Sequence, residues 1–233
     1  KLQKDCDGGD YVECFNLGYK YLIGKGINKN TTEAIKYFIK ACNGGVSEGC
    51  FNLGVMYEDG DGVTKDQVKA AELYTKACDL NYVRGCFNLG LMYSTGEGIK
   101  QDYFKAVELY TKACDLNYST GCFNLGVMYE NGQGVKQDYF KTIELYRKAC
   151  DSGDALGCAS MGFMFDEGNG VKQDYFKAAE LYKKGCDGAI VLGCFNLGFM
   201  YYHGHGVKQS EAEALKYYGR ACDLKSQAAC DVY

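Results

Sequence analysis

The sequence predicts an all-α solenoid built from a repeating pair of helices, and three observations carry this prediction. The first is a period of 36 residues that places cysteine at Cys14, Cys50, Cys86, Cys122, Cys158, Cys194 and Cys230. The second is a partner cysteine eight residues before each of these, at Cys6, Cys42, Cys78, Cys114, Cys150, Cys186 and Cys222. The third is apolar spacing typical of helices, with glycine at fixed places and no proline. In such a solenoid each unit buries its apolar face only against its neighbours.

The repeats organise the whole chain, so we expect one repeat domain over residues 1–233 instead of two domains. The copies are expected at about 14–49, 50–85, 86–121, 122–157, 158–193 and 194–229. Residues 1–5 match the last turn of a second helix, and residues 230–233 match the start of a first helix. We interpret the sequence as a mature chain or as a fragment of a longer array.

The first helix of each unit follows the cysteine link, and the third copy is the example. Cys86, Leu89, Gly90 and Tyr93 stand at offsets of 0, 3, 4 and 7, which places them on one side of a helix. Glycine inside a helix costs about 1 kcal/mol relative to alanine, so its recurrence at the Gly90 position predicts close approach of a partner helix. Further glycines, of which Gly96 is the first, are expected to end the helix.

The second helix of each unit is expected to begin near an aspartate whose carboxylate accepts from free amides of the first turn. These aspartates are Asp66, Asp102, Asp138 and Asp174. The apolar stripe of the third copy consists of Tyr103, Ala106, Val107, Leu109, Tyr110, Ala113 and Cys114. We expect Ala106 and Ala113 to receive the neighbouring helix where Gly90 leaves room. The unit is thus a helix–turn–helix of the tetratricopeptide kind.

Composition narrows the environment and the partners. Hydrophobic residues make up 47% of the chain, but no apolar run approaches the roughly 20 residues of a membrane span. The net charge is −4 and lysines alternate with acids, so the basic patch of a nucleic-acid-binding protein is missing. Fourteen cysteines are extreme for a compartment that keeps thiols reduced. We therefore expect a secreted or periplasmic protein.

A longer motif now gives a family resemblance. The run LG-x-x-Y-x-x-G-x-G-V/I-x-x-D-x-x-K-A, as in Leu89 to Ala106, resembles the SEL-type, tetratricopeptide-like repeat (SLR). The 36-residue period with a C-x7-C pair in every unit resembles the Helicobacter cysteine-rich proteins, over essentially the whole chain. The resemblance implies a right-handed superhelix of paired helices, secretion, and disulfides at the repeat junctions. Some members of that family are described as penicillin-binding or weak β-lactamase proteins, and members have been linked to host immune recognition.

The cysteine pairs can be interpreted as disulfides or as metal ligands. Cys78 ends one second helix and Cys86 begins the next first helix, so a tight corner can bring their Cα atoms within the roughly 4.4 to 6.8 Å that a disulfide needs. Each bridge should then contribute roughly 2 to 3 kcal/mol. Zinc sites favour cysteines two to four residues apart and usually recruit histidine, of which the chain has only 2. We favour one disulfide per repeat for all fourteen cysteines, with no metal and no cofactor.

Candidate ligand-binding residues lie along the first helices. Two residues after the cysteine stand Asn16, Asn52, Asn88, Asn124 and Asn196, and four residues further on stand Met56, Met92, Met128 and Met200. The resemblance to tetratricopeptide-like solenoids implies that first helices line the concave surface. The amides could clamp the backbone of an extended peptide, with methionine as an adaptable apolar contact. Alternatively, each asparagine bonds to the adjacent repeat and locks the stack.

Selectivity is expected from a position that varies between copies. Two residues before the cysteine stand Val12, Glu48, Arg84, Thr120, Leu156 and Leu192, of which Arg84 is our candidate ligand residue. The fifth copy departs from the pattern, because Ser160 replaces asparagine and interrupts the ladder.

The function classes that remain are a binding scaffold, a hydrolase and a structural spacer. No serine stands in an S-x-x-K motif and neither histidine in an H-E-x-x-H, so the catalytic residues of any β-lactamase stay unknown. We predict a secreted scaffold that binds a protein or extended peptide, including a host protein. The alternative that the resemblance implies is a weak hydrolase acting on a β-lactam or a cell-wall-like small molecule. Nucleic acid is not expected as a partner, and we expect a monomer.

Overall fold

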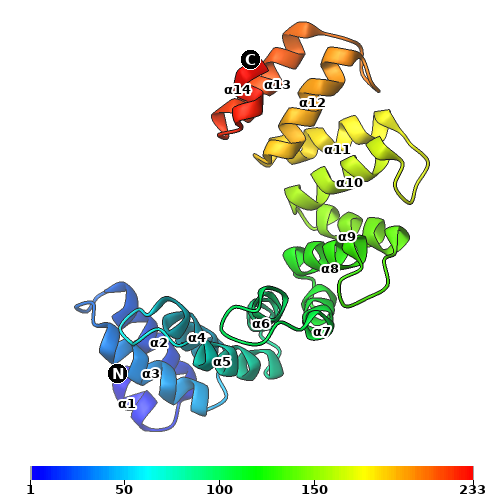
Figure 1. Ribbon diagram of the computed structural model, residues 1–233. Helices are drawn as coiled ribbons and strands as arrows, with labels where there is room; N and C mark the ends of the chain where they lie inside the picture. Colours follow the sequence, from blue (N-terminus) through cyan, green and yellow to red (C-terminus); the bar gives the residue numbers. More distant parts are fainter. Residues whose placement is uncertain (1, 233) are drawn as a thin grey trace. The chain divides into compact units, whose positions relative to one another are not determined.

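The computed structural model describes residues 2–232, and the regular structure in that range is entirely helical (Figure 1). The chain divides into two compact units, residues 1–116 and 117–233. Unit 1 contains α1 (Leu2–Asp7), α2 (Tyr11–Ile23), α3 (Thr31–Asn43), α4 (Ser47–Asp59), α5 (Gln67–Asp79), α6 (Val83–Thr95) and α7 (Tyr103–Asp115). Unit 2 contains α8 (Ser119–Asn131), α9 (Tyr139–Asp151), α10 (Ala155–Glu167), α11 (Tyr175–Asp187), α12 (Val191–His203), α13 (Glu211–Asp223) and α14 (Gln227–Val232).

The helices pack in consecutive pairs within each unit. The first helices of the repeats are α2, α4 and α6 in unit 1 and α8, α10 and α12 in unit 2; the second helices are α3, α5, α7, α9, α11 and α13. Each second helix packs against its own first helix, and α3 and α9 also pack against the first helices of the next repeats, α4 and α10. The predicted all-α repeat fold is confirmed. That residues 1–233 act as one folded domain stays a prediction.

The helix boundaries follow from the caps. The aspartates predicted to start second helices do so; for example, an oxygen of Asp66 accepts from the backbone N–H of Lys69 at 3.0 Å. First helices end as predicted at a glycine in the left-handed conformation, such as Gly96 with φ 77°. They begin earlier than the apolar pattern indicated, because α6 starts at Val83, three residues before Cys86. The turn between repeats is therefore shorter than the cysteine link.

The recurrent glycine in the first helix does mark a close approach, but its neighbour differs from the prediction. A Cβ added at Gly90 would lie 2.9 Å from Cε1 of Tyr110, so the ring takes this place instead of Ala106 or Ala113. The residues at the ring position of the second helices are Phe38, Tyr74, Tyr110, Tyr146, Tyr182 and Tyr218. Close packing of a large ring against a helix backbone needs the missing side chain, which explains the glycine at each copy.

Disulfides join the end of a second helix to the start of the next first helix. The pairs are Cys6–Cys14, Cys42–Cys50, Cys78–Cys86, Cys150–Cys158, Cys186–Cys194 and Cys222–Cys230. Their Cα atoms lie 4.4 to 4.7 Å apart, within the range that disulfides need. Cys114 and Cys122 are also disulfide-bonded, and no cysteine is free. The prediction of disulfides over metal ligands is confirmed.

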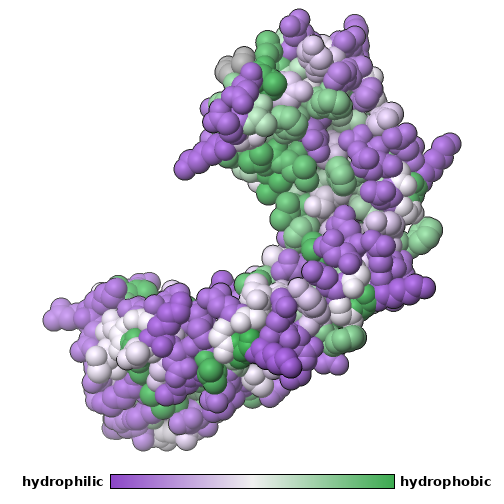
Figure 2. Space-filling model, viewed as in Figure 1, coloured by the Kyte–Doolittle hydropathy of each residue, from purple (hydrophilic) through white to green (hydrophobic). Residues whose placement is uncertain are grey.

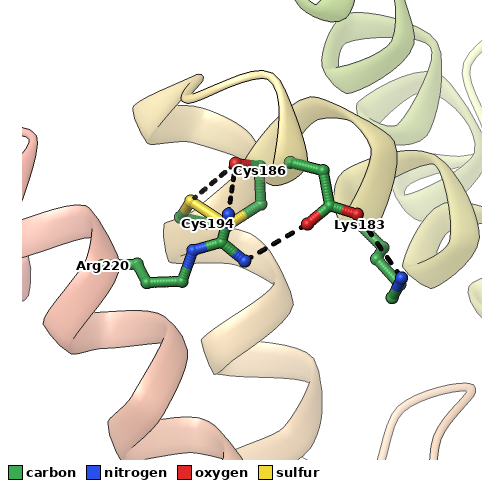
Figure 3. Close-up of a disulfide and its surroundings, with 5 residues drawn as sticks. Lys183, Cys186, Cys194 and Arg220 are labelled. Atoms are coloured by element: carbon green, nitrogen blue, oxygen red, sulfur yellow. Dashed lines mark hydrogen bonds and ion pairs between the residues drawn. A yellow bond between two sulfur atoms is a disulfide. The ribbon is translucent and has the colours of Figure 1, made fainter.

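A cation from the following repeat covers the last turn before the disulfide. Figure 3 shows Arg220 of α13 reaching back to the Cys186–Cys194 bridge. Its Nη2 donates to the carbonyl oxygen of Cys186 at 2.9 Å, and its Nη1 lies 3.2 Å from Asp187 Oδ1. In unit 1 the ammonium of Lys112 donates to the carbonyl oxygen of Cys78 at 2.7 Å. A cation near the C-terminus of a helix satisfies free carbonyl groups and complements the helix dipole.

The hydropathy of the helices bears on the predicted absence of a membrane span. Among residues 2–232, none of the helices combines the length and the apolar character that crossing a bilayer requires. Each of the first and second helices is 13 residues long.

Candidate functional site

One side of each first helix is left uncovered by the second helices. Relative to the cysteine of that helix, the uncovered residues stand two before, two after, five after and nine after; we call these four positions the first-helix face. In α12 they are Leu192, Asn196, Phe199 and His203. The spacings of 4, 3 and 4 residues place the four side chains on one side of a helix.

In unit 2 the first-helix face carries four exposed apolar side chains. They are Leu156 and Phe163 on α10, and Leu192 and Phe199 on α12; we call them the apolar band. Their exposed fractions are 38%, 37%, 37% and 42%. Helices α10 and α12 contact each other directly, so the four side chains belong to one surface. Figure 2 shows hydrophobic surface gathered over this part of unit 2.

In unit 1 the same face is mixed in character. Helix α4 presents Glu48 at the position two before its cysteine, and α6 presents Arg84. The guanidinium carbon of Arg84 lies 5.4 Å from the ring centroid of Phe51, so its planar group packs on an aromatic face while the residue stays exposed. Leu91 is the exposed apolar residue of α6 on this face. Charges therefore interrupt the apolar surface of unit 1.

The asparagines of two repeats interact with a tyrosine of the preceding repeat. The hydroxyl of Tyr182 on α11 donates to a carboxylate oxygen of Asp166 at 3.0 Å. Burial raises the pKa of Tyr182 above its usual value, the Asp166 carboxylate raises it further, and hydrogen bonding from Asn196 lowers it. In unit 1, Asn88 has the same effect on Tyr74, and the list of causes again begins with burial. These two amides thus connect one repeat to the next, as the locking alternative expected.

The other asparagines are placed differently. Asn52 donates to the backbone carbonyl oxygen of Glu48 in its own helix at 2.8 Å; its preceding repeat carries Phe38 at the ring position, which has no hydroxyl to offer. The amide of Asn16 donates to the Glu13 carboxylate at 3.4 Å, and Asn124 is half-buried. One such bond leaves each amide a second N–H and leaves its carbonyl oxygen available. The peptide clamp by asparagines therefore stays a prediction.

The predicted exposure of the methionines is wrong. Met56, Met92, Met128 and Met200 are exposed by only 3%, 3%, 3% and 1%. A residue six after the cysteine lies on the flank between the core stripe and the first-helix face, and in a stack of repeats the neighbouring helices cover that flank. These side chains fill the core and do not reach a ligand in this arrangement.

Sequence reasoning missed the position five after the cysteine, which supplies half of the apolar band. Its occupants are Tyr19, Val55, Leu91, Val127, Phe163 and Phe199. The signal was available, because all six residues are apolar or aromatic although their offset lies outside the core stripe. A consistent apolar residue on the side of a helix opposite its core indicates a functional surface.

The two histidines lie beside the end of α12. The ring centroids of His203 and His205 are 5.5 Å apart, and His203 is 4.2 Å from the ring centroid of Phe199. Within residues 2–232, no group of three or more His, Cys, Asp and Glu is placed to hold a metal ion. The histidines thus extend the aromatic surface of α12.

Comparison with solved structures places this geometry among known repeat proteins. The chain is similar to c5321, a protective antigen of uropathogenic Escherichia coli strains with an SLR fold: TM-score 0.94 and 30% identity over 98% of this chain and 49% of that one. It is also similar to a Sel1 repeat protein from Oxalobacter formigenes, with TM-score 0.82 and 24% identity over 91% of this chain and 85% of that one. Helicobacter pylori cysteine rich protein B matches at 36% identity and TM-score 0.47, over 57% of this chain and 96% of that one.

Comparison with protein families covers most of the chain. The Sel1 repeat model matches residues 14–46, 47–82, 83–118, 119–154, 155–189 and 191–226. None of the curated proteins matches the chain. The chain spans about half the length of the E. coli antigen. The resemblance to SLR proteins expected from the sequence is confirmed, and the chain belongs to the Sel1 repeat family.

Proposed function

We propose that this protein is a binding scaffold that holds an extended, apolar segment of another protein on the first-helix face of unit 2. The observation that carries the proposal is the apolar band. Four large apolar side chains stay more than a third exposed on two adjacent helices, although the rest of the core is well covered. Contiguous exposed apolar surface is typical of interaction sites and disfavoured elsewhere.

The surroundings of the band suit a peptide backbone as well as apolar side chains. Ser160 on α10 and Asn196 on α12 stand between the apolar residues of their helices, and both are half-buried. Each can exchange hydrogen bonds with main-chain groups of a bound segment. Burying the band would contribute about 25 cal/mol for each Å² of apolar surface removed from water. Apolar contacts would thus supply affinity, while the polar residues fix the direction of the segment.

The location of the protein is part of the same proposal. Disulfide bonds at the repeat junctions form and persist in oxidising compartments, which supports secretion or export to the periplasm. The similar E. coli protein is described as a protective antigen. By analogy, a host protein is a partner worth testing. The hydrolase alternative is not carried forward, since no observation in the structure favours it over binding.

The experiment is selection of random peptides displayed on phage against the oxidised full chain, followed by measured affinities of synthetic hits. Phe163→Ser and Leu192→Ser should each weaken the selected peptides by about tenfold, because each removes a large apolar contact. The matched controls are Phe140→Ser and Phe176→Ser, which remove equally exposed phenylalanines from second helices. Selected peptides that lose affinity with the controls and not with the band variants would contradict the proposal.

A further inference from the structure

A pocket of about 510 Å³ opens beside the apolar band, between α12, α13 and the end of α14. Its walls include Phe195 and Phe199 of α12, Leu215 and Tyr218 of α13, and Val232. Glu211, in the first turn of α13, is the charged residue among them. The pocket is therefore apolar in its walls and acidic at one side.

Comparison of the repeats explains why the pocket exists. In earlier repeats the hydroxyl of the ring-position tyrosine donates to a carboxylate sixteen residues before it, as Tyr146 does to Glu130 and Tyr182 to Asp166. For Tyr182, an asparagine fourteen residues later adds a second interaction. These internal partners fill the space around the hydroxyl in those repeats.

The last repeat lacks both partners. Tyr202 stands sixteen residues before Tyr218, where the others have an acid, and Val232 stands fourteen residues after it, where others have asparagine. Tyr218 is 7% exposed and packs against Phe195, with ring centroids 5.4 Å apart. No residue in the described range 2–232 hydrogen-bonds its hydroxyl. A largely buried hydroxyl without a partner loses stabilising hydrogen bonds unless a ligand supplies one.

We propose that this pocket takes a large apolar side chain of the bound segment, whose main-chain carbonyl accepts a hydrogen bond from Tyr218 and whose neighbouring basic residue pairs with Glu211. The inference rests on the proposed function and names its specificity site. The apolar walls fit the side chain, and the tyrosine hydroxyl replaces its missing internal acceptor with the carbonyl oxygen. Within residues 2–232, Glu211 takes part in none of the ion pairs, so it is available for an external cation.

The spacing of the two polar groups fits adjacent residues of a peptide. Glu211 and Tyr218 are seven residues apart on the same side of α13, which corresponds to about 10 Å along the helix. The pocket walls, including Leu215, lie between them. A basic residue followed by an aromatic one spans a similar length when extended, at about 3.3 Å per residue plus the long side chain of lysine. The ligand class is therefore a peptide with a basic residue beside a large apolar residue.

The test is titration of the oxidised full chain with three dipeptides, followed by NMR chemical shifts. The probe is acetyl-Lys-Phe-amide, and the comparison peptides are acetyl-Lys-Ala-amide and acetyl-Glu-Phe-amide. We expect the comparison peptides to bind at least about tenfold more weakly, because one lacks the side chain that fills the pocket and the other places a like charge beside Glu211. Equal binding of the three dipeptides, or no binding of the probe, would overturn the inference.

Two variants separate the pocket from the fold. Tyr218→Phe removes only the hydroxyl, so it should weaken the probe by about tenfold and leave stability unchanged. The matched control Tyr182→Phe removes an internally bonded hydroxyl, so it should lower stability and leave probe affinity unchanged. The double variant Tyr202→Glu/Val232→Asn restores the internal partners and should also weaken the probe. Unchanged probe affinity in Tyr218→Phe and in the double variant would contradict the inference.

The outcome of this test is distinguishable from failure of the proposed function. Selected peptides that depend on Phe163 but not on Tyr218 would leave the scaffold proposal standing and refute the pocket. Conversely, a dipeptide that binds at Tyr218 while no selected peptide depends on Phe163 or Leu192 would limit binding to the pocket and refute the wider scaffold.

Discussion

Units 1 and 2 share one architecture but present different surfaces. Both stack 13-residue helices in pairs, end their first helices with left-handed glycines and carry disulfides at repeat junctions. On the first-helix face, however, α4 and α6 carry Glu48 and Arg84 where α10 and α12 carry Leu156 and Leu192. The difference teaches that the repeat fixes the interior, whereas the exposed positions of each copy are free to specialise for binding.

The largest expected effect concerns what the units share. The double variants Cys42→Ser/Cys50→Ser in unit 1 and Cys150→Ser/Cys158→Ser in unit 2 each open a loop of about nine residues, and each should cost about 2 to 3 kcal/mol. Because the two bridges occupy equivalent positions, the losses should be similar. Urea unfolding with hydrogen exchange, read separately for residues 1–116 and 117–233, measures this. Loss of protection in the unit that keeps its bridges would contradict independent stapling.

The second effect concerns the tyrosine–carboxylate pairs, which occur in both units. Tyr74→Phe in unit 1 and Tyr182→Phe in unit 2 remove a hydroxyl that donates to a carboxylate, and each should cost about 1.5 kcal/mol. Tyr218→Phe should change the free energy of unfolding by less than about 0.5 kcal/mol, since its hydroxyl has no internal partner to lose. Chemical denaturation of the three variants measures the difference. Equal losses in all three would mean that Tyr218 is also bonded internally.

A third prediction converts one unit into the other. Glu48→Leu/Arg84→Leu gives α4 and α6 the residues of α10 and α12 at this position, so unit 1 should gain affinity for the selected apolar peptides by about tenfold. Stability should change by less than about 0.5 kcal/mol, because both side chains are at the surface. Isothermal titration with Phe163→Ser in the background isolates the new site. Absence of any gain would show that these two positions do not decide where the peptide binds.

The predictive power of the sequence differed between interior and surface for physical reasons. The period, the aspartate caps and the cysteine spacing depend on residues near one another in the chain, and the structure confirms them. Burial of Met92 depends on how neighbouring repeats cover a helix flank, which periodicity within one helix does not reveal. The pairing of Tyr74 with Glu58 joins different helices, and the orientation of Asn52 depends on a phenylalanine in the previous repeat.

The smallest effect concerns the turns between repeats. Ala189 in unit 2 adopts a left-handed conformation with φ 60°, where unit 1 has Gly45 with φ 83°. An L side chain is strained there, so Ala189→Gly should stabilise the protein by about 0.5 to 1 kcal/mol, and Gly45→Ala should destabilise it by a similar amount. Thermal unfolding of both variants measures the two changes. Equal signs for the two substitutions would contradict strain as the cause.

The central claim is that the apolar band of unit 2 is the binding surface. Hydroxyl-radical footprinting of the oxidised full chain, with and without a selected peptide, reports the solvent exposure of individual side chains. We expect protection of Leu156, Phe163, Leu192 and Phe199 by bound peptide, with Phe140 and Phe176 of the second helices unchanged. Protection of Phe140 and Phe176, with the four residues of the band unchanged, would contradict the claim.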